Sequence, residues 1–370
     1  PQAHDIISFW LFHTVVKCYE HTGEVPFQDA MITGFVLDEN REKMSKSRGN
    51  VVSPEEVLEE YPVDAARYWA ARSKLGNDFA FQEEELEEGE KLMRKIWNAS
   101  KLVDQLTDEK PKKPNELEEI DSWMLAEQDQ LIEELTECME KYEFSKARDE
   151  LRSFFWDTFC GDYLEITKQR LDAEDSQSAR YAPRKAHRKF IKLFAPLLSH
   201  ITEEIWNQMY SGNSIHTSSW PEKSGEDADL EAGENAMQVI SALRKYKSQN
   251  QMSLNEEIEH VQIFGNISGM EGAIKEVMHV QELENLEEEP ETEKKVIEIS
   301  LDYSKAGPKY GDKIGEIEEA LENEEWMLDG ARLEVAGKHL KAEEFEVREE
   351  VTYTGEGEML ETEGCIIIIQ

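Results

Sequence analysis

Apolar residues recur at helical spacing almost throughout the stretch from Glu83 to about Met209, and this pattern constrains the fold more than any other feature. Three stripes stand out, beginning at Leu131, Phe144 and Phe190. Each stripe is long enough to bury one face of a helix, and the links between the stripes are short. Such a series predicts an antiparallel bundle of three or four long helices. The segment 110–115, which contains two prolines, is expected to be a surface link within this bundle.

The residues before the bundle predict short helices and one strand. Apolar side chains repeat at helical spacing over 5–20, and the apolar run 31–37 is typical of a strand. In Ser53-Pro54-Glu55-Glu56 the serine can cap a helix, the proline suits its first position and Glu56 completes a capping box. This helix is expected to end at Pro62, and Asp64 is expected to cap the next one.

Beyond Leu254 the pattern changes from helices to short strands. Four strands are expected at 261–264, 296–299, 333–335 and 345–347, with a helix over 315–321 and a closing strand at 366–369. This alternation predicts a separate small α+β domain. The glutamate-rich run from Glu282 to Glu293 is expected to be a solvated loop.

The charge balance limits the partners that the chain can bind. It contains 41 lysine and arginine residues against 81 aspartate and glutamate residues, a net charge of −40. RNA phosphates are repelled by such a surface, so any RNA contact requires a local basic patch. Self-repulsion of this size is tolerable where salt screens the charges. We therefore expect a protein from a salt-loaded cytoplasm, and its length of 370 residues predicts several domains.

The cysteines and the hydropathy argue against a metal site and a membrane span. Cys18, Cys138, Cys160 and Cys365 lie far apart and form no CxxC pair, so they are expected to be reduced, mostly buried thiols. No bound metal is predicted. No run reaches the roughly 18 apolar residues of a membrane helix, and no signal peptide is visible. A cytoplasmic location without membrane contact is expected.

A run of lysines and serines carries the clearest chemical signal. Lys43-Met44-Ser45-Lys46-Ser47 follows the expected strand and is itself followed by Arg48-Gly49-Asn50. Ammonium groups on a flexible loop can meet the negative charge that develops on a departing pyrophosphate. Hydroxyl and backbone N–H groups add donors, and Gly49 allows a close turn. Taken alone, the run is equally compatible with a surface turn.

The run and its surroundings resemble the KMSKS loop of class I aminoacyl-tRNA synthetases, most closely in the valyl branch of the valine/isoleucine group. The similarity continues over segments on both sides, at 34–38, 49–54, 64–69, 75–78, 95–100, 201–206, 214–221 and 243–248. The last of these is similar to archaeal valyl enzymes. Because many separate segments agree, the resemblance covers most of the chain.

The resemblance implies a fold and a reaction. The fold would be mixed α and α/β: the C-terminal part of a Rossmann-type catalytic domain with the KMSKS loop (1–60), a helical connecting segment (61–90), a helical-bundle anticodon-binding domain (91–220) and a C-terminal helix with a small α+β domain (230–370). The reaction would be ATP-dependent activation of valine and its transfer to tRNA(Val), with Mg²⁺ carried by the nucleotide. The chain starts at Pro1 rather than at a methionine, so we expect the C-terminal portion of a larger, monomeric enzyme, inactive alone. An isoleucyl enzyme and a stand-alone tRNA-binding module remain open.

The resemblance also implies roles for individual residues. Lys43 and Lys46 would be catalytic, and Met44, Ser45, Ser47 and Asp5 would bind ATP, Asp5 at the adenylate ribose. Ile6 and Trp10, one helical turn apart, would line the aliphatic pocket, although core packing explains their spacing as well. The family pattern at this place is Gly-x-Asp-Ile-Ile, whereas this chain has Ala3 at the glycine position.

Two clusters of basic residues are candidates for tRNA backbone contact. Arg184, Lys185, Arg188 and Lys189 fall at helical spacing and are expected to form one basic face, with salt bridges to acidic helices as the alternative. Arg244 and Lys245, with Lys247 nearby, form the second candidate. The aromatic group Phe154, Phe155, Trp156 and Phe159 is expected to be core, and His200 and His216 are expected to be structural.

Overall fold

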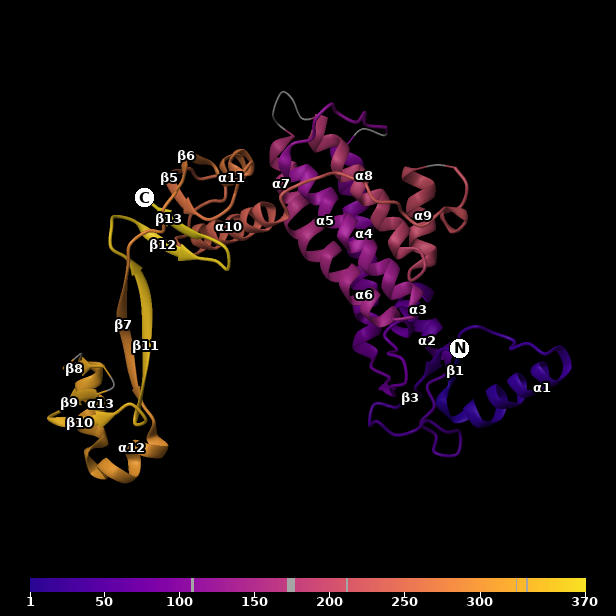
Figure 1. Ribbon diagram of the computed structural model, residues 1–370, viewed down its shortest axis with the longest axis horizontal. Coiled ribbons are helices and arrows are strands. Elements are labelled where there is room, and N and C mark those ends of the chain that lie inside the picture. The colour runs from indigo at the N-terminus through magenta and orange to yellow at the C-terminus, as the bar shows by residue number, and fades with distance from the viewer. Residues whose placement is uncertain (108–109, 172–176, 211, 324, 331) are drawn as a thin grey trace. The chain divides into compact units, whose positions relative to one another are not determined.

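The computed structural model describes residues 1–370 except 108–109, 172–176, 211, 324 and 331 (Figure 1). The chain divides into two compact units. The first comprises Pro1–Ile240 and Ile267–Val277, and the second comprises Ser241–Asn266 and Met278–Gln370. The first unit is mainly helical and the second mixes helices with sheets, which confirms the expected mixed fold class.

Four very short strands organise the N-terminal part of the first unit. Strand β1 (Gln2–Ala3) pairs in parallel with β2 (Ile32–Thr33), and β3 (Val36–Leu37) pairs in parallel with β4 (Phe79–Ala80). The strand expected over 31–37 is therefore split at Gly34. A Cβ atom on Gly34 would lie 2.0 Å from the carbonyl oxygen of Asn77, so only glycine allows this close approach.

The helix expected over 5–20 is present but irregular at its start. A 3₁₀ turn, η1 (His4–Ile6), is followed by a π-helical turn, η2 (Ile7–Leu11), and then by α1 (Phe12–Thr22). Helix α1 ends at Gly23, whose φ of 76° gives a left-handed C-cap. The regular α-helical turn expected between Ile6 and Trp10 is thus replaced by two other helical forms.

The capping box predicted at Ser53 is confirmed. The Ser53 hydroxyl accepts from the amide of Glu56, the Glu56 carboxylate accepts from the amide of Ser53, and α2 (Pro54–Glu60) follows. The expectation for Asp64 is wrong. It lies inside α3 (Val63–Ala70), and its buried carboxylate accepts from the amides of His200 and Ile201, at the start of a distant helix.

The predicted bundle is confirmed between residues 83 and 209. Its helices are α4 (Glu83–Leu106), α5 (Glu119–Glu140), α6 (Phe144–Ser153), the π-helix η3 (Phe154–Tyr163), α7 (Leu164–Arg170), α8 (Gln177–Phe194) and α9 (Ser199–Met209). Helix α5 packs against α6 and α8, and α8 also contacts α4 and α9 (Figure 1). The predicted aromatic core is confirmed for Phe155 and Phe159, which are fully buried against Phe190, whereas Phe154 and Trp156 are half-buried.

Residues after the bundle form a strap, defined here as 218–229, before α10 (Leu230–Gln249) and α11 (Glu271–Met278). A short 3₁₀ turn, η4 (Ile215–Thr217), precedes the strap. Ser211, the first residue of the loop expected here, lies outside the described residues. The helix expected over 234–248 is confirmed by α10.

The second unit contains a four-stranded sheet in the order β12-β13-β5-β6. Its strands are β5 (Ile258–Phe264), β6 (Val280–Asn285), β12 (Glu358–Glu361) and β13 (Ile366–Ile369). The expected strand at 261–264 and the closing strand at 366–369 are therefore confirmed. The run from Glu282 to Glu293 is a loop only in part, since Glu282 lies in β6 and Glu293 in β7.

A two-stranded ribbon carries a small module at its end (Figure 1). Strands β7 (Thr292–Leu301) and β11 (Phe345–Tyr353) pair antiparallel along their lengths. Between them lie α12 (Tyr303–Tyr310), η5 (Gly311–Lys313), α13 (Ile314–Glu322), β8 (Trp326–Asp329), β9 (Arg332–Val335) and β10 (Lys338–Lys341). An apolar core that includes Ile317 and Leu333 of the module and Leu301 and Phe345 of the ribbon holds the two together.

Candidate functional site

The lysine loop, residues 43–47, lies in a turn that hydrogen bonds close at its base. The carboxylate of Asp38 accepts from the backbone amides of Asn40 (3.0 Å) and Glu42 (2.7 Å). Its second oxygen accepts from the Asn50 side chain at 2.7 Å, and the Asn50 oxygen accepts from the Ser45 amide at 2.9 Å. The hydrogen bond from Asn50, followed by that from the Glu42 amide, lowers the pKa of Asp38.

The two lysines of the loop have different surroundings. The Lys43 ammonium lies 4.1 Å from the centre of the Phe35 ring, a cation–π contact. Lys46 is exposed, and no hydrogen bond or ion pair holds its ammonium among the residues that the structure describes. The hydroxyls of Ser45 and Ser47 lie 3.3 Å apart, and Gly49 has a φ of 72°. The loop therefore presents one stacked and one open ammonium group.

Phe35 connects the lysine loop to the first residues of the chain. The His4 ring contacts Phe35 edge-on with 4.6 Å between ring centres, on the segment that also contains Asp5. The amide of Phe35 donates to the Asp78 carboxylate at 2.7 Å, which fixes the backbone under the ring. Three segments distant in sequence thus meet at Phe35.

The pocket residues inferred by resemblance are exposed. Asp5 lies on the 3₁₀ turn, and the exposed fractions of Ile6 and Trp10 are 37% and 53%. Trp10 stacks on Phe27 with 6.1 Å between ring centres. The structure therefore leaves an open apolar surface on this segment, and it places Asp5 next to His4 and so near the ring that Lys43 contacts.

The single basic face expected on α8 is wrong. Arg184 is 3% exposed and its guanidinium pairs with Asp104 at 3.0 Å, while Lys189 is 8% exposed and pairs with Asp129 at 2.8 Å. Both cations neutralise carboxylates of neighbouring helices, which was the alternative reading of this cluster. Burial lowers the pKa of Lys189, and the hydrogen bond with Asp129 opposes this change.

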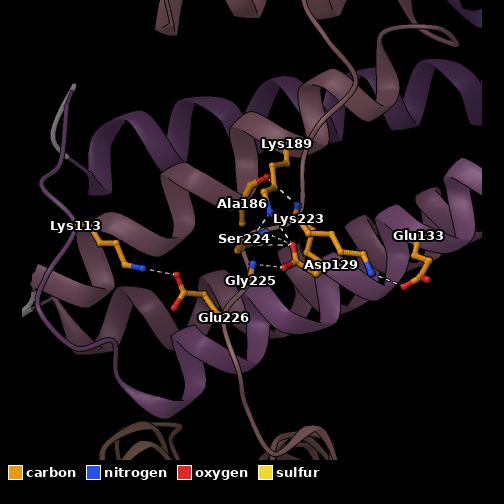
Figure 2. A network of polar contacts seen from close by, with 10 residues as sticks. Lys113, Asp129, Glu133, Ala186, Lys189, Lys223, Ser224, Gly225 and Glu226 are labelled. Carbon is orange, nitrogen blue, oxygen red and sulfur yellow. Dashed lines mark hydrogen bonds and ion pairs between the residues drawn. The ribbon is translucent and has the colours of Figure 1, made fainter.

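Figure 2 shows how the Lys189–Asp129 pair also holds the strap. The Asp129 carboxylate accepts from the backbone amides of Ser224 (2.7 Å) and Gly225 (2.8 Å) as well as from Lys189. Burial raises the pKa of Asp129, but these donors outweigh it and the pKa lies below its usual value. The pair is therefore part of the architecture rather than a free anion-binding surface.

The other two members of the cluster remain accessible. Lys185 is half-buried and Arg188 is exposed, and both line a groove of about 360 Å³ together with Lys192 and Trp220. The Arg188 guanidinium lies 5.2 Å from the centre of the Trp206 ring. This arrangement of cations and indole rings suits a phosphate group beside a planar base.

Comparisons with known proteins identify the family. The model for "tRNA synthetases class I (I, L, M and V)" matches residues 2–82, and the model for "Anticodon-binding domain of tRNA ligase" matches residues 121–263. The chain is 56% identical to the valine–tRNA ligase of Haloarcula marismortui over 372 residues, which cover 100% of the chain and 41% of that protein. The chain belongs to the valine–tRNA ligase family.

Another valine–tRNA ligase, from Pyrococcus furiosus, is 36% identical over 391 residues that cover 98% of the chain and 43% of that protein. The chain thus spans less than half the length of either relative. The crystal structure of the ternary complex of Agrobacterium radiobacter K84 agnB2 LeuRS-tRNA-LeuAMS has a similar fold, with a TM-score of 0.50, 20% identity, and coverage of 62% of this chain and 30% of that chain. The Haloarcula match fits the expected salt-adapted archaeal character.

The second basic cluster of this valine–tRNA ligase family member, like the first, contains both accessible and buried cations. Lys245 is exposed and Arg244 half-buried on α10. Lys247 is fully buried, and its ammonium donates to the carbonyl oxygens of Leu254 (3.0 Å) and Met278 (2.7 Å). Lys247 is therefore a structural cation and is not available to RNA.

The histidines and cysteines behave as expected from sequence. His200 bonds the Asp64 carboxylate at 2.9 Å, and the His216 ring lies 3.0 Å from the Ser199 carbonyl oxygen. Cys18, Cys138, Cys160 and Cys365 are free thiols, and all but Cys18 are buried. Within the described ranges, no group of three or more histidine, cysteine, aspartate or glutamate side chains is placed to hold a metal ion. Nor is any described helix long and apolar enough to cross a membrane.

Sequence reasoning missed the residues that position the lysine loop. From sequence, Asp38 and Asn50 are only flanking residues of the lysine loop, whereas the structure joins their side chains. A signal was present, because an aspartate at the start of a turn commonly accepts from the backbone amide two residues later, which is an Asx-turn. The partner twelve residues away gave no such local signal.

Proposed function

We propose that this chain carries the ATP-clamping loop and the anticodon-binding bundle of a valine–tRNA ligase. The observation that carries the proposal is the lysine loop, which lies beside the Asp5 segment inside the region matched by the class I model. In this proposal residues 1–60 complete the catalytic domain, 61–90 connect it to the bundle at 91–220, and 230–370 form the C-terminal domain.

The loop would act in the activation step. A carboxylate oxygen of valine attacks the α-phosphorus of ATP, the bond to the bridging oxygen breaks, and pyrophosphate leaves with the electron pair. Negative charge grows on the leaving group, so ammonium groups that approach it stabilise the transition state more than the bound substrate. The open ammonium of Lys46 and the ring-stacked ammonium of Lys43 are the groups proposed for this role, with Mg²⁺ carried by the nucleotide.

The other candidates bind rather than react. The hydroxyls of Ser45 and Ser47 and the backbone at Met44 would donate to phosphate oxygens, and Asp5 would accept from the adenylate ribose. Ile6 and Trp10 would contact the aliphatic side chain of valine, because their exposed apolar surface is available for such a contact.

The bundle and helix α10 would bind tRNA(Val) through a small number of exposed or half-buried cations. Lys185 and Arg188 on α8, and Arg244 and Lys245 on α10, are the proposed contacts, with the tRNA backbone held by charge and unstacked bases held by stacking. The acyl group would then pass to the tRNA 3′ end with release of AMP. We also propose that the enzyme is a monomer and acts in the cytoplasm, where tRNA is charged.

The test is valine-dependent ATP–pyrophosphate exchange in the complete polypeptide that carries this chain. Lys46→Ala should lower the exchange rate by about two orders of magnitude or more, because a charge interaction made in the transition state is lost. Affinity for tRNA should change little. Lys91→Ala is the matched control, since Lys91 makes an exposed ion pair with Glu87 on α4.

Two outcomes would contradict the proposal. An unchanged exchange rate in Lys46→Ala removes the catalytic assignment of the loop. Pyrophosphate exchange that depends on isoleucine rather than valine contradicts the proposal that valine is the substrate.

A further inference from the structure

The base of the lysine loop is closed by two side chains that sit just outside it. Asp38 precedes the loop and Asn50 follows it, and their side chains meet at 2.7 Å. Neither residue has a role in the function proposed above. We call this pair the Asp38–Asn50 bracket.

Every hydrogen bond of the bracket acts on the path of the loop backbone. One Asp38 oxygen accepts hydrogen bonds from the backbone amides of Asn40 and Glu42, which fixes the chain just before the loop. The Asn50 oxygen takes the amide of Ser45, and its nitrogen donates to Asp38 and more distantly, at 3.4 Å, to the carbonyl of Lys43. Lys43 and Ser45, the residues on both sides of Met44, are thus hydrogen-bonded to the same side chain, that of Asn50.

The side chains of the loop are held far less firmly than its backbone. Lys46 and Ser47 are exposed, and Lys43 has the ring contact with Phe35. The ion pair between Arg48 and Glu42 lies in solvent, with exposed side-chain fractions of 60% and 63%, and such pairs contribute little. The bracket therefore constrains where the two ammonium groups can reach, together with the backbone hydrogen bonds from the amides of Arg48 and Gly49 to the Ser45 carbonyl oxygen.

We propose that Asp38 and Asn50 are positioning residues that set the geometry of the lysine loop for pyrophosphate release. This inference rests on the proposed function of the loop. A displacement of about 1 Å at a catalytic group can cost about a hundred-fold in rate, so loosening the backbone at Ser45 lowers kcat even though neither residue touches substrate. The KM for ATP changes much less, because the contacts affected are made in the transition state.

The chemistry of the bracket allows an exchange of its two side chains. In Asp38→Asn an amide nitrogen faces the Asn50 nitrogen or else the amides of Asn40 and Glu42, so donors oppose donors whichever way the group rotates. In Asn50→Asp two carboxylates face each other. In the double variant D38N/N50D, the new asparagine accepts from the two amides and donates to the new aspartate, which still accepts from the Ser45 amide.

The experiment measures valine-dependent pyrophosphate exchange and tryptic cleavage within the loop for the complete polypeptide, both single variants and the double variant. We expect each single variant to lose about ten- to a hundred-fold in kcat with a much smaller change in KM for ATP, and to be cleaved faster after Lys43 or Lys46. The double variant should recover most of both properties. Glu39→Gln, which removes an exposed carboxylate from the same turn, is the matched control and should behave as the parent.

Each result decides the inference. Single variants with parental kcat overturn it, and so does a double variant as slow as the single ones, since the bracket would then not be what the loop requires. A parent without valine-dependent exchange is a failure of the proposed function instead, and it is distinguished by the parent reaction alone.

Discussion

Replacing Asp129 with asparagine should destabilise the first unit by about 3 kcal/mol. Asp129 is 7% exposed, and its carboxylate accepts from Lys189 and from the amides of Ser224 and Gly225 (Figure 2). An asparagine amide in the same place turns its nitrogen toward at least one of these donors, and it leaves the Lys189 ammonium buried without a counter-charge. Breaking a buried pair from one side costs about 3–5 kcal/mol. We take the lower value because the Ser224 hydroxyl remains 2.6 Å from Lys189.

Urea unfolding followed by circular dichroism of the helices, in about 1 M KCl, measures this cost. At this salt concentration the Debye length is about 3 Å, so exposed pairs are screened while the buried pair is not. Glu133→Gln is the control, because its ion pair with Lys223 is largely exposed and is expected to contribute less than about 1 kcal/mol.

The pH dependence gives a second test of the same carboxylate. The pKa of Asp129 is lowered in the folded state, so its contribution is present above the unfolded pKa and is lost as the pH falls through the folded value. Asp129→Asn should remove this acid-dependent part. A variant that unfolds within 1 kcal/mol of the parent would refute the reasoning.

Two further predictions concern α8. Burial lowers the pKa of His187 to about 3, so only the unfolded state gains a proton at this residue between pH 7 and pH 5. Urea unfolding at the two pH values should therefore show that the parent loses about 2 kcal/mol of stability from this group and that His187→Gln does not. Arg188→Ala should weaken tRNA(Val) binding and reduce the slope of log K against log[KCl] by about one, whereas Lys101→Ala, which removes an exposed cation of α4, should change neither. Filter binding over a KCl series measures both slopes, and equal slopes would contradict the proposed contact.

Features determined by neighbouring residues could be predicted from the sequence. The capping box at Ser53 depends on residues three apart, and the helices of the bundle depend on a repeat of 3.6 residues, so both were correct. The lysine loop was also identified locally, because its residue types and its place after a strand are visible along the chain.

Features determined by residues far apart in the sequence could not be predicted from it. Asp64 has the residue type of a helix cap and does cap a helix, but the His200 amide that it accepts from lies 136 residues later. Arg184 and Lys189 have the spacing of a basic face, but the acidic partners that remove them from the surface lie on α4 and α5. Helical periodicity gives the direction of a side chain relative to its own axis, and it does not identify what lies in that direction.

The ribbon of β7 and β11 has a consequence for how the chain can change its length. Leu301 and Phe345 are paired across the two strands, so the chain enters and leaves the module at neighbouring positions of the ribbon. Paired strands lie about 4.8 Å apart, a gap that a two-residue turn closes. The apolar core of the module includes Leu301 of β7 and Phe345 of β11, whereas the sheet β12-β13-β5-β6 takes no strand from the module. A gene could therefore gain or lose the segment between these two residues as a cassette, at the cost of one hairpin turn and of exposing the apolar side chains of Ile299, Leu301 and Phe345.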